Sequence, residues 1–102
     1  MVDFDKEGFL KDLADWDEEV AETIAADMEI HLTQAHWEII TLIRKFYRRY
    51  QLSPATRALT SYVKRELGPD KGKSTYLMRL FGGSAAKTVA KIAGLPKPDN
   101  CL

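Results

Sequence analysis

Apolar residues recur every three or four positions along most of this chain, which is the spacing of an amphipathic α-helix. The pattern is clearest over 34–50, where basic residues lie between the members of one apolar stripe. We expect that stripe to be buried, and it consists of His36, Ile39, Ile40, Ile43, Phe46, Tyr47 and Tyr50. Shorter patterns of the same kind predict helical stretches over about 6–13, 18–28, 54–67, 74–81 and 85–93.

Residues with known positional preferences mark several helix ends. Asp17 and Thr33 precede two of the apolar patterns and are suitable N-caps. Ser53 followed by Pro54 has the order expected of an N-cap and a first helical residue. Gly94 follows the last pattern, at a position where a left-handed residue commonly ends a helix.

The other segments contain no convincing pair of β-strands, although residues 1–4 could form one short strand. A length of 102 residues suits a single compact domain. The predicted fold class is mostly α, a small orthogonal bundle of about five helices over 1–94. We expect an extended, mobile arm over 95–102, because Pro96 and Pro98 stiffen the chain and prevent a helix.

Composition excludes several classes of protein. With one cysteine, Cys101, no disulfide can form within the chain, which excludes a secreted disulfide framework. The N-terminus lacks the features of a signal peptide, and no apolar run approaches the roughly 20 residues of a membrane helix. We therefore expect a soluble cytoplasmic protein without a membrane partner. His31 and His36 alone do not make a zinc site, and no Gly-rich phosphate loop is present, so no metal or cofactor is expected.

The net charge of zero conceals an uneven distribution. Residues 1–38 hold 12 acidic and 2 basic residues, whereas residues 39–102 hold 3 acidic and 13 basic ones. Two interpretations stay open. The two halves attract each other within one fold, or the basic half binds an acidic or phosphate-rich partner.

A helix-turn-helix module for nucleic acid is one version of the second interpretation. The long predicted helix, a short connection and the helix after Ser53 have the right order. Seven basic side chains on these helices could meet phosphates: Arg44, Lys45, Arg48, Arg49, Arg57, Lys64 and Arg65. Against it, the connection lacks the glycine often found in such turns, and a dedicated nucleic-acid binder is usually basic overall.

Cys101 is the next-to-last residue, which is unusual because buried free cysteines behave as core residues. An extended arm over 95–102 could carry its thiol about 25 Å from the body, at roughly 3.3 Å per residue. Lys91 and Lys97 could favour the thiolate, while the α-carboxylate of Leu102 opposes ionisation. Such a thiol could transfer a group between proteins; the alternative is a loosely held tail with an incidental cysteine.

The last twelve residues, KIAGLPKPDNCL, resemble the C-terminal signature of the DsrC/TusE family, KIAGLPKP-x-x-C-x. Further segments resemble the family's motifs in the same order: GFLKDLADW (8–16), LTQAHWEII (32–40), SPATRAL (53–59), LGPDKGKS (67–74) and YLMRLF (76–81). The similarity covers about residues 4–102, and the ordered set of motifs is highly specific.

The resemblance implies a mostly α-helical fold with a small N-terminal β-hairpin, a mobile C-terminal arm and a role in passing sulfur between proteins. Members that serve dissimilatory sulfite reductase carry a second cysteine eleven residues before the penultimate one, and that position is Ala90 here. The chain is therefore similar to the single-cysteine, TusE-like branch. For that branch the resemblance implies a TusBCD- or DsrEFH-like sulfur donor and an MnmA-like tRNA thiouridylase as acceptor, with Cys101 carrying the sulfur toward tRNA 2-thiouridine.

These observations define a candidate site and leave alternatives beside the relay. Cys101 is the expected catalytic residue, and partner contacts are expected at Lys91, Lys97, Arg44, Arg48 and Arg57. His36 should be a core or half-buried histidine rather than a catalytic base. A DsrC-like role in sulfur oxidation or sulfite metabolism stays open, as do the nucleic-acid module and an adaptor that docks without carrying sulfur.

Overall fold

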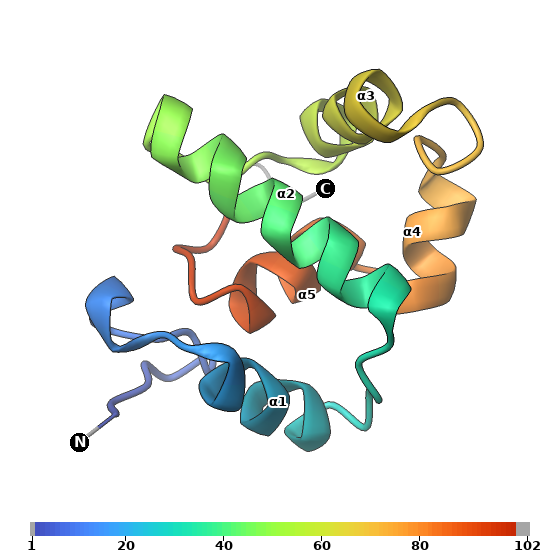
Figure 1. Ribbon diagram of the computed structural model, residues 1–102. Coiled ribbons are helices and arrows are strands. Elements are labelled where there is room, and N and C mark those ends of the chain that lie inside the picture. Colours follow the sequence, from blue (N-terminus) through green and yellow to red (C-terminus); the bar gives the residue numbers. More distant parts are fainter. Residues whose placement is uncertain (1, 100–102) are drawn as a thin grey trace.

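The computed structural model describes residues 2–99, and these fold into a bundle of helices (Figure 1). The helices are α1 (Glu18–Asp27), α2 (Gln34–Tyr50), α3 (Thr56–Leu67), α4 (Ser74–Phe81) and α5 (Ala85–Ile92), preceded by the 3₁₀ turn η1 (Leu13–Asp15). The predicted fold class is confirmed. The bounds predicted for α2 and α4 are also correct.

Helix α5 lies at the centre, because α1, α2, α3 and α4 all pack against it. Figure 1 shows α1 on one side of α5 and α2 crossing it on the other. Small side chains allow this close approach: Ala85, Ala86 and Ala90 are buried, and Val89 and Ile92 have no exposed surface. The C-terminal end of α5, where the arm begins, is therefore held from several directions.

Most of the apolar stripe on α2 is buried as predicted. Ile39, Ile40 and Ile43 lie in the core, and His36 is buried with them. The stripe does not stay buried to its end, since Tyr50 is 43% exposed. Figure 1 shows the reason: the last turns of α2 project beyond α5.

The helix predicted over 6–13 is wrong. The Asp5 carboxylate accepts hydrogen bonds from the N–H groups of Glu7 and Phe9, both at 2.9 Å. Gly8 then turns the chain at a φ of +87°, and Phe4 pairs with Leu10 in an isolated antiparallel bridge. An Asp side chain that satisfies nearby N–H groups competes with helix formation, so the apolar pattern here belongs to a turn. Within the described residues, the expected N-terminal strand or hairpin is reduced to this bridge.

The predicted start of α3 is wrong by two residues. The helix begins at Thr56 with Ala55 as its N-cap, not at Pro54 with Ser53 as cap. The Ser53 hydroxyl instead donates a 2.6 Å hydrogen bond to the carbonyl of Pro96. A residue with good capping chemistry is thus used for a contact with the C-terminal segment.

Candidate functional site

The expected catalytic residue, Cys101, lies outside the described residues. The structure therefore bears on the site through the segment that leads to it, 93–99, and through the surfaces around that segment. The proposed division into a helical domain over 1–94 and a mobile arm over 95–102 stays a prediction.

The last carbonyls of α5 are bonded by side chains from elsewhere in the chain. The indole N–H of Trp16 donates to the carbonyl of Ile92 at 2.9 Å, and a guanidinium N–H of Arg44 donates to that of Ala93 at 2.6 Å. The Arg44 guanidinium lies 3.8 Å from the centre of the Trp16 ring. Carbonyls at a helix C-terminus carry partial negative charge and lack partners within the helix, so a cation suits this place.

Arg44 was expected to contact a partner, and in the structure it is half-buried with its guanidinium bonded to the C-terminal end of α5. Burial lowers the pKa of Arg44 from its ordinary value, and repulsion from Arg48 lowers it further. A guanidinium stays charged across the physiological range even so. Its position therefore stabilises the attachment of the arm, and this use was not visible in the sequence.

The first residues of the arm lie against the bundle. Leu95 is 2% exposed, and its N–H donates to the carbonyl of Ala90 at 2.9 Å. Pro96 is bonded by Ser53, as described above. The next residue, Lys97, lies 3.1 Å from the carboxylate of Glu7, at the surface. Contacts from the N-terminal loop and from the connection between α2 and α3 thus meet on residues 95–97.

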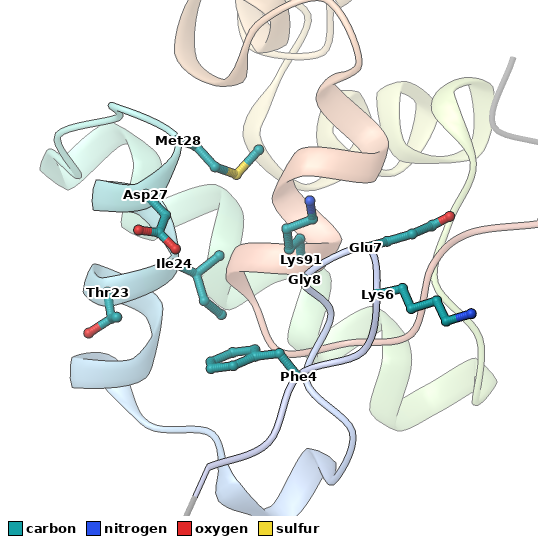
Figure 2. Close-up of a pocket in the computed structure, with 9 residues that line it drawn as sticks. All are labelled: Phe4, Lys6, Glu7, Gly8, Thr23, Ile24, Asp27, Met28 and Lys91. Carbon is teal, nitrogen blue, oxygen red and sulfur yellow. The ribbon is translucent and has the colours of Figure 1, made fainter.

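Lys91 also lies beside the N-terminal loop, but it contacts a different residue from Lys97. Its Nζ atom lies 5.2 Å from the centre of the Phe9 ring, and its side chain borders a cavity of about 420 Å³ between α1 and the N-terminal loop. Figure 2 shows Lys91 rising from α5 beside this cavity, with Ile24 of α1 across from it. The Glu7 side chain points away from the cavity (Figure 2).

Arg48 and Arg57 are exposed and belong to α2 and α3. Arg48 borders an open depression between these helices, together with Lys45, Arg49, Tyr62, Arg65 and Glu66. The five expected partner contacts therefore do not form one patch. Lys91 and Lys97 lie toward the N-terminal loop, and Arg44 is half-buried against the end of α5. Arg48 borders the depression on α2, and Arg57 is exposed on α3.

His36 is a core histidine, as predicted. Its Nε2 lies 2.8 Å from the carbonyl of Leu80, and because a carbonyl can only accept, this nitrogen carries the proton. The other nitrogen, Nδ1, then accepts from the N–H of Thr33 at 3.1 Å. The ring also meets Phe81 edge-on at 5.1 Å. His36 thus joins the start of α2 to the end of α4 with both nitrogens bonded.

Residues 2–99 were also considered as a source of metal ligands and of membrane-spanning helices, with the following result for each. No group of three or more His, Cys, Asp or Glu side chains in this range is arranged to hold a metal ion. None of the helices described is both long and apolar enough to cross a membrane.

Comparison with known proteins gives full-length matches. The family described as "DsrC like protein" matches residues 1–102. The chain is 46% identical over 101 residues to the "Sulfurtransferase TusE" of Photorhabdus laumondii, covering 99% of this chain and 91% of that protein. It is 48% identical over 101 residues to the "Sulfurtransferase TusE homolog" of Haemophilus influenzae, covering 99% and 93%.

Solved structures agree with the sequence matches. The NMR structure of Allochromatium vinosum DsrC superposes with a TM-score of 0.88 at 41% identity, over 100% of both chains. The oxidized gamma-subunit of the dissimilatory sulfite reductase (DsrC) from Archaeoglobus fulgidus has a TM-score of 0.82 at 40% identity, over 99% of this chain and 92% of that one.

Proposed function

Because this chain belongs to the family of DsrC-like proteins, we propose that it is a sulfurtransferase that carries sulfur as a persulfide on Cys101. The observation that carries the proposal is the placement of its one thiol, next to last in the chain and beyond a segment bonded to the bundle. The relatives named sulfurtransferase support the reaction class.

The chemistry needs no cofactor and no net oxidation. The Cys101 thiolate attacks the terminal sulfur of a donor persulfide, an S–S bond forms at Cys101, and the donor cysteine leaves as a thiolate. An acceptor thiolate then attacks the terminal sulfur of the Cys101 persulfide, and Cys101 returns as a thiolate. One sulfur atom moves in each step, and the number of S–S bonds is unchanged.

We assign the donor to a TusBCD- or DsrEFH-like complex and the acceptor to an MnmA-like tRNA thiouridylase that makes 2-thiouridine in tRNA, all in the cytoplasm. The position of a second family cysteine is occupied by Ala90, which has no exposed surface. No disulfide or trisulfide within the chain can form, which favours the single-thiol relay over the two-thiol chemistry of sulfite reduction.

Intact mass spectrometry tests the proposal. The reduced protein is incubated with cysteine desulfurase, cysteine, a TusA-like carrier and the TusBCD-like complex. A gain of about 32 Da, one sulfur atom, is expected on Cys101 and should be absent in Cys101→Ser. No gain with an active donor, while the thiol still reacts with an alkylating reagent, would refute the relay.

A further inference from the structure

The contacts at residue 96 limit how far the Cys101 thiol can travel from the bundle. Cys101 lies five residues beyond Pro96, so with Ser53 bonded to Pro96 the thiol can reach about 17 Å, at roughly 3.3 Å per residue. An arm free from residue 95 would reach about 23 Å by the same measure, since Cys101 lies seven residues beyond Gly94. A partner that exchanges sulfur with Cys101 must therefore approach the surface around Ser53 closely.

Two large apolar side chains are exposed beside that attachment point. Tyr50, the last residue of α2, is 43% exposed, and Leu52, in the short connection to α3, is 53% exposed. Exposed apolar groups that lie together and are ringed by polar ones commonly mark interaction sites. Tyrosine in particular is enriched at the centres of protein interfaces.

Cations lie beside Tyr50 and along the adjoining depression, and the Arg49 guanidinium is 5.5 Å from the centre of the Tyr50 ring. Lys45, Arg48, Arg49 and Arg65 border the depression between α2 and α3, and Glu66 is the acidic residue among its lining. The Glu66 carboxylate lies 3.4 Å from Arg65 and neutralises part of its charge. Hydrogen bonding to Arg49 and to Arg65 lowers the pKa of Tyr50. We call the six residues Lys45, Arg48, Arg49, Tyr50, Leu52 and Arg65 the basic corner.

We propose that the basic corner is the docking surface for a sulfur-relay protein whose contact face has an acidic rim around an apolar socket. This inference rests on the proposed function, because only a partner that exchanges sulfur with Cys101 has to come within that reach of Ser53. The apolar centre favours a protein over a nucleic acid, since Leu52 gains nothing from a phosphate backbone. A protein socket would bury Tyr50 and Leu52, while acidic side chains would meet the arginines.

The test is binding of the TusBCD-like donor complex to the full-length chain, measured by calorimetry. Arg48→Glu should raise the Kd about tenfold or more, and Leu52→Ala about fivefold, as expected for central interface residues. Arg79→Glu is the matched control, because Arg79 is also an exposed arginine in the last turn of a helix, α4. It should change the Kd less than twofold. Circular dichroism checks that each variant is folded.

Loading kinetics separate docking from chemistry. Arg48→Glu should load Cys101 at the wild-type rate when the donor is saturating, with the loss confined to KM. Equal binding by wild type, Arg48→Glu and Leu52→Ala would overturn the inference while the relay stands. An equal loss in Arg79→Glu would also overturn it, since only overall charge would then matter. If wild type neither binds nor loads, the proposed function fails and the inference falls with it.

Fluorescence anisotropy with a labelled tRNA transcript tests the alternative that the basic corner binds nucleic acid. We expect no difference between wild type and Arg48→Glu in tRNA binding. If Arg48→Glu loses salt-dependent tRNA binding and keeps wild-type affinity for the donor complex, the basic corner is a nucleic-acid surface and the inference is overturned.

Discussion

Gly94 provides a sharp test of how the arm is attached to the bundle. It follows α5 at a φ of +72°, a conformation that disfavours a β-carbon. A β-carbon there would also overlap the indole ring of Trp16. That ring donates to the carbonyl of Ile92 and stacks under Arg44. The substitution Gly94→Ala should therefore strain the backbone and displace Trp16 at the same time.

The loss of unfolding free energy caused by Gly94→Ala can be worked out from these contacts. The left-handed conformation costs alanine about 1–2 kcal/mol. Loss of the Trp16 hydrogen bond adds about 0.5–1.5 kcal/mol. Loss of the cation–π contact with Arg44 adds about 0.5–1 kcal/mol. The free energy of unfolding should thus fall by about 2–4.5 kcal/mol, a large part of the 5–15 kcal/mol typical of a domain.

A double-mutant cycle separates strain from displacement. In a Trp16→Ala background the ring is already absent, so Gly94→Ala should cost only about 1–2 kcal/mol of backbone strain. Urea unfolding followed by far-UV circular dichroism measures all four proteins, because that signal does not depend on the tryptophan. If Gly94→Ala lowers the free energy of unfolding equally in both backgrounds, the packing of Gly94 against Trp16 is refuted. A loss below about 1 kcal/mol in the wild-type background would refute it as well.

Three further predictions concern single side chains. In an alkaline absorbance titration, the signal that Tyr50→Phe removes should appear below the ordinary pKa of tyrosine, because hydrogen bonding to Arg49, and next to Arg65, lowers the pKa of Tyr50. Since the folded pKa lies below the unfolded one, stability relative to Tyr50→Phe should be gained as pH rises through the folded pKa; parallel pH profiles would contradict this. His36→Ala should reduce the free energy of unfolding by about 2–4 kcal/mol in urea, since it leaves a cavity and an unbonded carbonyl, and a loss below about 1 kcal/mol would count against the bonded core histidine. Ser53→Ala should free the carbonyl of Pro96 and raise the mobility of the next amide in NMR relaxation, with its order parameter falling from about 0.85 toward 0.6; an unchanged value would contradict the attachment.

Local patterns were sufficient for the long helices and insufficient at the N-terminus. α2 could be predicted because its apolar stripe has 3.6-residue periodicity and is long enough to be unambiguous. The stretch 6–13 is too short for that, and the bonds of the Asp5 carboxylate produce a turn with similarly spaced apolar residues.

In the candidate site, too, some features could be predicted from the sequence and others could not. Cys101 could be chosen from the sequence, because a lone thiol at the chain end is a local feature and the motif around it is specific. The use of Arg44 inside the fold could not, since a cation in a helical pattern looks the same whether it faces solvent or a carbonyl 49 residues away. The hydrogen bond from Ser53 to Pro96 could not be predicted either, because the two residues are far apart in the sequence. The Ser-Pro pair predicted a helix cap instead.

The sequence by itself determined the helical class, the positions of the main helices and the family, and it supplied the thiol that we propose as the sulfur carrier. These depend on periodicity, on residue types and on ordered motifs, all of which are local along the chain. Only the tertiary structure decided how the arm begins, because Trp16, Arg44 and Ser53 meet residues 92–96 across long sequence separations. Those contacts arise from packing around α5, and no local pattern encodes which distant groups that packing brings together.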